Sequence, residues 1–393
     1  MYLYGKETAW NMVCTKMVAE RKLLATRGTD CPTASLSQDI LKVAALTQGG
    51  YLPSDRFRIR QNIPYLRKYG IEIDEFSPFL PQYTRLPGRL GDIRERYMLP
   101  YALVKLMLSC VGRVPGAIAS HRTDLTWIGR TFITGFEGLV RFVRGPRVLD
   151  VDDAIWLTTP FGQRAAARFA MKMDAVIASN SFIADWYSQY CKSVYVVPGG
   201  IDTNRFKPAD NGPKADADDF LIGWTGTSVN FHELYEIESV LASFLHDHPN
   251  TRLRIISNAP PRFTRIPSDR FEFRRWTADT EGSDLNDLDM GIMPLRETEW
   301  AKGKNSNKML CYMASGLPVV VSPVGTNAEI LRMGNIGFGP VSGDDWYVCL
   351  SSLLNDRSAC IEMGAAGRTV VEREFSNAVI STKLARVFRE MAR

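Results

Sequence analysis

The chain has 393 residues, enough for two or three domains, and its 45% apolar and 23% charged content is that of an ordinary globular protein. No apolar run approaches the ~18 residues that span a bilayer, and the first residues lack the order of a signal peptide. The seven scattered cysteines show no CxxC spacing and the four histidines no metal-ligand pattern. We therefore expect a cytoplasmic protein with reduced thiols and no bound metal.

The net charge of +5 is unevenly distributed. Lys and Arg outnumber Asp and Glu by 9 in residues 1–200, whereas the acidic residues are in excess by 4 in the remainder. A basic first half favours an anionic partner there, such as a phospholipid surface, a lipid-phosphate acceptor or a polyanion. An uneven surface charge without functional consequence would look the same, so both interpretations stay open.

The first half of the chain alternates apolar runs of strand length with segments of helical periodicity, which predicts βα units. Residues 1–40 precede them and are interpreted as an N-terminal extension. The predicted strands are Leu41–Thr47, Ile71–Phe76, Gly116–Ser120, Arg147–Val151, Val176–Ser179 and Tyr195–Val197. The predicted helices are 54–69 and 89–110, and the second is amphipathic, so it is either buried or in contact with a membrane surface.

Several of these predicted elements carry or precede candidate site residues. The first strand leads to Gly49 and Gly50, a glycine turn that is only a weak nucleotide signal without GxGxxG. Arg56 lies on the first predicted helix, where it faces either an acceptor or solvent. His121 and Arg122 follow the third predicted strand, at a position suited to contact with a substrate.

A pair of carboxylates, Asp152 and Asp153, follows the fourth predicted strand. Such a pair can orient the hydroxyl groups of an acceptor. Adjacent carboxylates also cap helices, here a helix beginning at Ala154, and the sequence does not decide between these roles.

The second half repeats the alternation after a polar segment with Pro and Gly, Ala209–Asp219, which predicts an interdomain linker. The predicted strands are Phe220–Trp224, Arg252–Ser257, Phe271–Trp276, Met290–Leu295 and Val319–Ser322. The predicted helices are Glu233–His246, Met309–Ala314, Leu350–Leu354 and Ala359–Phe375.

Parallel strands place ligands at their carboxyl ends, so polar residues after the strands of two such domains are expected to meet in one cleft. The candidates in the second half are Thr225, Gly226, Ser228, Trp276, Thr277, Lys304, Asn305, Asn307 and Lys308. Trp276 either stacks on a base or belongs to the core.

Lys308 is the strongest of these candidates. It opens a predicted helix, where free backbone N–H groups and the positive end of the helix favour an anion. A cation in the first turn opposes the helix dipole by ~0.3–1 kcal/mol, and a bound diphosphate would reverse that sign. The alternative is an exposed lysine in a solvated basic loop.

The stretch from Lys308 to Ser322, KMLCYMASGLPVVVS, resembles the donor-binding signature of family 4 (GT-B) glycosyltransferases. VPGGIDTNRFKP at 197–208 is similar to the pattern that closes the first domain in that family. The chain departs from the family at Gly303 and Cys311, where two glutamates are usual. It resembles instead a divergent branch, matched by Trp300, Gly303, Lys304, Lys308, Leu310 and Tyr312.

The resemblance implies an α/β fold of GT-B architecture, with two Rossmann-like domains facing each other across a cleft. The acceptor-side domain would span 41–208, with a C-terminal helix at 377–393 packing back on it. The linker would span 209–219 and the donor-side domain 220–376.

The resemblance also implies an activity and its partners. A sugar would pass from a UDP- or GDP-linked donor to a hydroxyl group of a glycan or lipid-linked glycan, with retention of configuration and without cofactor or metal. Surface polysaccharide or glycolipid biosynthesis is the expected pathway, and no nucleic acid partner is expected. The protein would lie in the cytoplasm, with possible contact to the inner face of the cell membrane.

Roles for single residues follow in the same way. His121 would contact the donor sugar, and Lys304 and Lys308 would stabilise the leaving diphosphate. The donor-binding residues would be Gly49, Gly50, Thr225, Gly226, Ser228, Trp276, Thr277, Asn305, Asn307 and Lys308. The acceptor residues would be Arg56, Arg122, Asp152 and Asp153.

Two other functions stay open because the glutamate pair is missing. One is a GT-B enzyme without transfer, such as a sugar-nucleotide epimerase or hydrolase. The other is a sugar-nucleotide-binding protein without catalysis.

Overall fold

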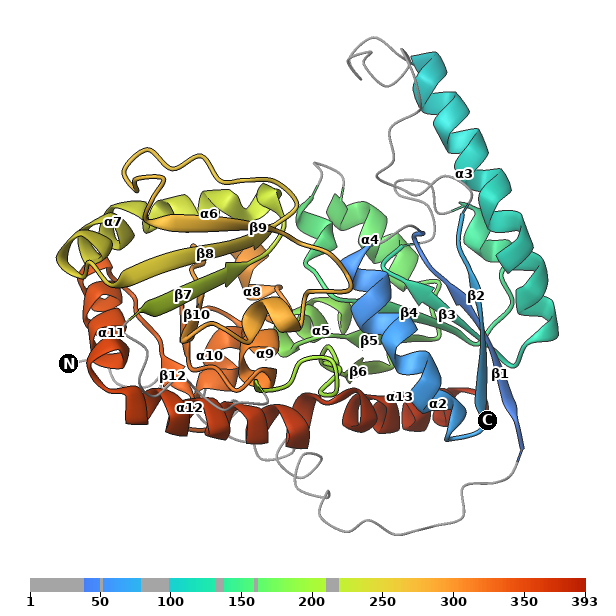
Figure 1. Ribbon diagram of the computed structural model, residues 1–393. Coiled ribbons are helices and arrows are strands. Elements are labelled where there is room, and N and C mark those ends of the chain that lie inside the picture. The colour runs from blue at the N-terminus through green and yellow to red at the C-terminus, as the bar shows by residue number, and fades with distance from the viewer. Residues whose placement is uncertain (1–38, 50–51, 79–98, 132–137, 159–161, 210–218) are drawn as a thin grey trace, which may run out of the picture. The chain divides into compact units, whose positions relative to one another are not determined.

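The computed structural model describes residues 39–49, 52–78, 99–131, 138–158, 162–209 and 219–393. Ile40–Arg393 form one compact unit that contains two parallel six-stranded sheets (Figure 1). This confirms the predicted α/β fold with two sheet domains. The predicted extension 1–40 and the predicted linker 209–219 lie almost entirely outside the described residues.

The first sheet has the strand order β2-β1-β3-β4-β5-β6. Its strands are β1 Leu41–Leu46, β2 Ile71–Phe76, β3 Leu125–Gly129, β4 Arg147–Val151, β5 Ala175–Ala178 and β6 Val194–Val196. Its α-helices are α2 Ile63–Arg67, α3 Leu99–Ala119, α4 Gly162–Ala170 and α5 Ser181–Tyr187. The predicted helix 54–69 is broken into a π-turn at Asp55–Ile59, a 3-10 turn at Arg60–Asn62 and α2.

The second sheet has the strand order β12-β11-β10-β7-β8-β9. Its strands are β7 Phe220–Thr225, β8 Thr251–Ser257, β9 Phe271–Arg275, β10 Met290–Met293, β11 Val319–Val321 and β12 Gly337–Phe338. Its helices are α6 Phe231–Glu236, α7 Glu238–Asp247, α8 Glu299–Lys302, α9 Asn307–Ala314, α10 Thr326–Leu331, α11 Gly343–Asn355 and α12 Arg357–Val370.

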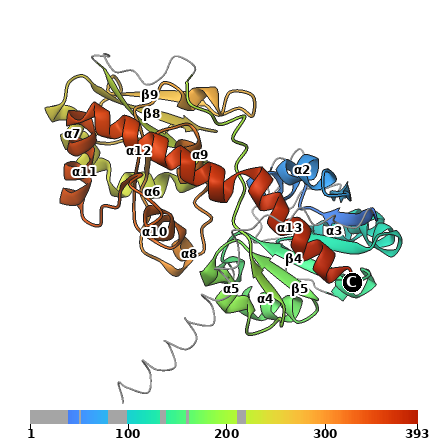
Figure 2. The ribbon, with the colours of Figure 1, turned by 90° about the horizontal axis from the view of Figure 1, so that it is seen from below.

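The central strands of both sheets are buried on both faces, as expected for parallel strands with nearly continuous apolar residues. The edge strands β2, β6, β9 and β12 are partly exposed. In the second sheet one face packs against α9 and α12 and the other against α6, α7 and α11. In the first sheet one face packs against α4 and α5. Figure 2 shows this arrangement from a second direction.

The last helix, α13 Asn377–Met391, covers the other face of the first sheet. Ile380, Leu384 and Phe388 lie in the core built by β1, β2 and β3, and the Phe388 ring lies 5.0 Å from that of Trp127. Figure 2 shows α12 beside α9 of the second sheet and α13 beside α2 of the first. The chain therefore returns to its first sheet after completing the second.

The predicted strand at Gly116–Ser120 is wrong. These residues form the end of α3 and a 3-10 turn at Ser120–Arg122, and the strand is β3 instead. Gly116 is needed for packing of a helix on the sheet, because a Cβ there would meet the Leu46 side chain at 2.5 Å. The run of small residues therefore marks a close helix contact and not a strand.

The predicted helix at 89–110 overlaps α3, but its first ten residues lie outside the part of the chain that the structure describes. Within the described part, no helix has both the length and the apolar character that crossing a bilayer requires.

Candidate functional site

A cavity of about 450 Å³ lies between the carboxyl ends of the strands of the two sheets. Its volume is in the range of ordinary small-molecule sites. The first-sheet side and the segment between the sheets contribute Pro53, Ser54, Arg56, Phe57, Asp152, Asp153 and Phe206. The second-sheet side contributes Thr225, Gly226, Thr227, Asn230, Asn258, Trp276, Glu281, Leu285, Met293, Trp300, Lys304, Asn305, Ser306, Asn307, Lys308 and Cys311.

The cavity brings together most of the residues predicted from sequence. Predicted residues in its lining are Arg56, Asp152, Asp153, Thr225, Gly226, Trp276, Lys304, Asn305, Asn307 and Lys308. Ser228 and Thr277 are not in the lining, although each directly follows a lining residue. Gly49 is not in the lining either, and Gly50 lies outside the described residues.

Helix α9 points its first turn into this cavity. Ser306 precedes the helix in the left-handed conformation, with φ of 49°, which turns the chain sharply into the helix. Lys308 follows in the first turn, with its Nζ 4.2 Å from the centre of the Trp224 ring. Burial, and next the neighbouring Lys304, lowers the pKa of Lys308 to about 7. A partly buried lysine beside another cation is a site prepared for an anion.

Gly226 is required for this position of Lys308. A Cβ at Gly226 would lie 2.7 Å from the Lys308 Nζ and 2.8 Å from the Trp224 ring. The absence of a side chain at this residue therefore lets the ammonium group approach the end of β7.

The second lysine, Lys304, is held by residues from the other side of the same sheet. Its Nζ donates to Asn230 Oδ1 at 3.3 Å and lies 3.8 Å from Glu233 Oε1. Glu233 is buried and also accepts a hydrogen bond from the backbone N–H of Arg296 at 2.9 Å. Glu233 thus fixes Lys304 at the edge of the cavity beside Lys308.

The loop that carries Lys304 is fastened to the first-sheet side. The Asn180 side chain donates to the carbonyls of Lys302 and Lys304, at 3.4 and 3.3 Å. Gly303 lies against Ala154, since a Cβ at Gly303 would meet Cβ of Ala154 at 2.6 Å. The glycine found here in place of the usual glutamate is thus a point of close contact across the cleft.

The carboxylates at the end of β4 form a cluster with Arg130. Arg130 has φ of 59°, a conformation that non-glycine residues adopt rarely and mostly at functional sites. Its guanidinium lies 2.5 Å from Asp153 Oδ2 and 3.4 Å from Asp152 Oδ1. Burial, and next the adjacent Asp152, raises the pKa of Asp153. No side chain caps the 3-10 turn that follows, so capping does not explain the pair.

His121 and Arg122 are not in the cavity. They lie in the 3-10 turn that precedes β3, at the amino end of the sheet, whereas the cavity is at the carboxyl ends. The ring of His121 interacts with the Phe142 carbonyl at 3.0 Å. The expected contact of His121 with the donor sugar came from the resemblance and from a strand predicted to end there. The structure has the end of α3 and a 3-10 turn at that position instead, and both His121 and Arg122 lie outside the cavity lining.

Three further residues of this region were not predicted: Arg130, Glu233 and Glu281. Arg130 follows the true β3, which the sequence pattern missed. Glu233 and Glu281 lie in stretches without a recognisable motif, and only the folded chain brings them to the lysines and arginines of the cavity.

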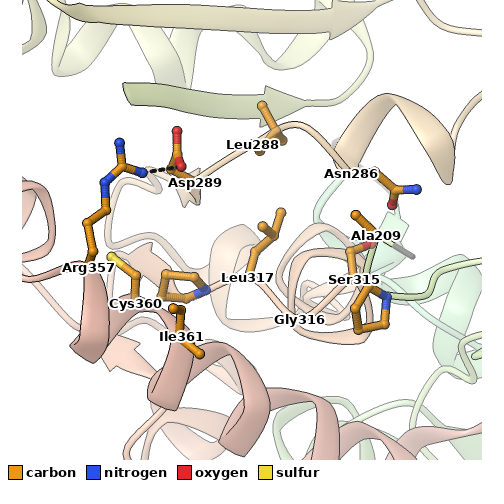
Figure 3. Close-up of a pocket in the computed structure, with 12 residues that line it drawn as sticks. Ala209, Asn286, Leu288, Asp289, Ser315, Gly316, Leu317, Arg357, Cys360 and Ile361 are labelled. Atoms are coloured by element: carbon orange, nitrogen blue, oxygen red, sulfur yellow. Dashed lines mark hydrogen bonds and ion pairs between the residues drawn. The ribbon is translucent and has the colours of Figure 1, made fainter. Parts of the chain in front are cut away.

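A second, much smaller pocket of about 70 Å³ lies beside Pro208 and Ala209 (Figure 3). None of its lining residues lines the cleft cavity. Arg357 forms an ion pair there with Asp289 and lies 4.6 Å from the centre of the Phe220 ring. This volume accommodates a few water molecules and not a sugar nucleotide. Among the residues that the structure places, no three His, Cys, Asp or Glu side chains gather in a way that could hold a metal ion.

The two parallel sheets and the cleft between them define a GT-B type of fold, and comparison with solved structures agrees. Sucrose-phosphate synthase from Thermosynechococcus elongatus aligns with a TM-score of 0.63 and 14% identity, over 89% of this chain and 98% of that one. Anabaena HepE, solved with UDP and glucose, aligns with a TM-score of 0.65 and 16% identity, over 89% and 100%. The UDP-forming α,α-trehalose-phosphate synthase from Burkholderia vietnamiensis gives 0.62 and 12%, over 90% and 98%.

Comparison with protein families identifies a domain in the second half of the chain. Residues 224–356 match the family described as Glycosyl transferases group 1, so the chain contains a domain of that kind. The protein is an enzyme of the glycosyltransferase class. A search of curated proteins finds no match.

Proposed function

We propose that the protein transfers a sugar from a UDP- or GDP-linked donor to a hydroxyl group of a glycan or lipid-linked glycan. The reaction retains the configuration at the anomeric carbon and uses neither cofactor nor metal, and it serves surface polysaccharide or glycolipid biosynthesis. The alternatives with the same fold are a sugar-nucleotide epimerase or hydrolase and a binding protein without catalysis.

The observation that carries the proposal is the pair of lysines at the start of α9. Lys308 is held against the Trp224 ring and Lys304 is held by Asn230, so both ammonium groups face the cavity without needing to rearrange. Preorganised cations and free N–H groups at a helix start stabilise the charge that develops on a leaving diphosphate. That the HepE structure contains UDP and glucose supports UDP as the first nucleotide to test.

The acceptor side of the reaction is assigned to the end of β4. Asp152 is buried, its Oδ1 lies 3.4 Å from Arg130 Nε but accepts no hydrogen bond from the described groups, and Asp152 and Asp153 both line the cavity. Carboxylate oxygens accept hydrogen bonds from hydroxyl groups, so the pair holds a hydroxyl-bearing acceptor opposite the lysines.

Contact with a membrane is assigned to α3. Met107, Val111, Val114 and Ile118 follow each other at helical spacing and are each 48–64% exposed, and the helix contains no acidic residue. Arg122 follows the helix, and the nearby 3-10 turn Gly138–Phe142 adds Arg141, which stacks on the half-exposed Phe142. An apolar stripe ending in cations fits the surface of an anionic lipid bilayer.

A screen of sugar nucleotides by thermal shift tests the donor assignment, because a ligand at about 100 times its Kd stabilises a protein by roughly 2.7 kcal/mol. The responding nucleotide is then incubated with candidate glycan acceptors, and the anomeric configuration of the product is read by NMR. Nucleoside diphosphate release without any acceptor would favour a hydrolase. Binding without turnover on any acceptor would favour a binding protein.

Sedimentation with vesicles tests the membrane assignment. Binding to phosphatidylserine-containing vesicles should weaken as salt rises, since exposed charges are screened beyond ~10 Å at 0.1 M. Equal binding to neutral and anionic vesicles would remove the electrostatic part of the proposal.

A further inference from the structure

A carboxylate, Glu281, stands in the cavity between arginines from the opposite side of the cleft. It follows β9 of the second sheet and is 5% exposed. Arg56 Nη1 lies 2.5 Å and Arg205 Nε 2.8 Å from the same oxygen, Oε1. Both arginines contact Oε1, and the other oxygen, Oε2, accepts no hydrogen bond from the residues that the structure describes, so it is available to a ligand in the cavity.

The backbone around Glu281 fixes this arrangement. The next residue is Gly282, where a Cβ would lie 2.3 Å from the Arg205 carbonyl oxygen. Only a residue without a side chain lets the two segments approach so closely. Glu281 is therefore positioned by a backbone contact as well as by the two guanidinium groups.

Residues of α9 relate Glu281 to the lysine site. Cys311 comes three residues after Lys308, so both side chains lie on the same face of the helix, about 4.5 Å apart along its axis. Glu281 lines the same cavity as Lys308 and Cys311, and its charge, after burial, raises the pKa of the Cys311 thiol. The carboxylate of Glu281 therefore faces the same cavity as the diphosphate site.

The other end of the cavity is aromatic. The guanidinium of Arg56, which contacts Glu281, also lies 5.5 Å from the centre of the Trp276 ring. The contacts therefore run in the order Lys308, Cys311, Glu281, Arg56 and Trp276. A nucleoside diphosphate has the same order of chemical groups: an anionic diphosphate, a ribose with two vicinal hydroxyl groups, and a flat base.

We propose that Glu281 determines specificity for the ribose of the donor, with its Oε2 accepting a hydrogen bond from a ribose hydroxyl group. Acidic side chains serve ribose hydroxyl groups in this way at other nucleotide sites. Here the carboxylate comes from the turn after β9 and not from α9, whose residue at that level is Cys311. The proposal rests on the proposed function, because it takes the ligand to be a nucleoside diphosphate.

Titration calorimetry with UDP, GDP and their 2′,3′-dideoxy counterparts tests the proposal. The wild type should bind the ribonucleotide about 10- to 100-fold more tightly than its dideoxy counterpart, the range of one hydrogen bond to a charged group. Glu281→Gln should reduce this preference to less than about 3-fold. Glutamine keeps one side-chain oxygen, and the two arginines, which are donors, should hold it in the place of Oε1. Its NH₂ group then stands in the place of Oε2, so the hydrogen-bond acceptor for the ribose hydroxyl group is lost.

Glu362→Gln, an exposed change on α12, is the matched control and should keep the wild-type preference. The proposal is overturned if the wild type binds both forms equally, a result that needs no variant to fold, or if Glu281→Gln keeps the full preference. Equal binding of the ribonucleotide and its dideoxy counterpart would leave the proposed function intact. A wild type that binds neither UDP nor GDP would overturn the proposed function and this proposal together.

Discussion

Lys308 should make the binding of a sugar nucleotide depend on pH. With its pKa at about 7 in the free protein, roughly nine in ten of these side chains are neutral at pH 8 and roughly one in ten at pH 6. A bound diphosphate favours the ammonium form, so binding should take up roughly 0.9 proton at pH 8 and roughly 0.1 at pH 6. The affinity should accordingly weaken about tenfold from pH 6 to pH 8.

Calorimetric titration in buffers of different ionisation enthalpy measures this proton uptake directly. UDP-glucose and GDP-mannose are better probes than free UDP and GDP, whose terminal phosphates themselves titrate near pH 6. Lys308→Met should abolish the uptake at pH 8 and weaken binding at pH 6 by roughly 10–150-fold. Lys302→Met, which removes a lysine paired with Glu299 outside the cavity, should change neither.

The same shift has a consequence for stability without ligand. The pKa of Lys308 is lowered from 10.5 to about 7 by folding, so between these values the unfolded chain binds more protons than the folded one. The free energy of unfolding should therefore rise with pH from about 7 toward 10.5, and Lys308→Met should remove that contribution. Intact binding by the wild type at pH 8 with no proton uptake would refute the lowered pKa of Lys308.

Three further changes have expected outcomes. Gly226→Ala should displace the Lys308 ammonium and weaken nucleotide binding at least about tenfold in a folded protein, measured by calorimetry; an unchanged Kd would contradict the close approach. Arg58→Met should lower the free energy of unfolding by about 3–5 kcal/mol in urea, because it leaves the carboxylate of Asp150 buried without its partner at 2.7 Å; a loss below about 1 kcal/mol would argue against that ion pair. Asp153→Asn should slow transfer at unchanged nucleotide affinity, whereas His121→Ala should be fully active. If rate assays show the reverse, His121 takes part in transfer and Asp153 does not.

The sequence predicted the α/β class because buried parallel strands are nearly continuous apolar runs. Arg147–Val151 was predicted with the bounds that the structure gives, and the strands at Leu41 and Phe220 begin where predicted. Ile71–Phe76 also has the predicted bounds, although acidic residues interrupt its apolar pattern. The failure at Gly116–Ser120 has a physical cause. Small residues were expected to pair in a sheet, but Gly116 brings a helix close to β1.

The candidate site was predicted where a polar residue or glycine follows a strand, as with Asp153 and Gly226, or where a lysine opens a helix, as with Lys308. It was missed where the chemistry depends on contacts between distant segments. Glu281 meets Arg56 across 225 residues, and no local pattern reports such a pair. Arg130 depends on a left-handed backbone turn after a strand that the periodicity did not reveal.

The return of α13 to the first sheet affects how the protein can be made and divided. Ile380, Leu384 and Phe388 complete a core begun by Leu41–Leu46, so the first sheet keeps one face uncovered until residues 377–391 have left the ribosome. A chimaera that exchanges donor halves must keep residues 377–391 with the half at the amino terminus. A nick between α12 and α13 would cut the chain into two fragments that still share one hydrophobic core. The two fragments would separate only when the protein unfolds.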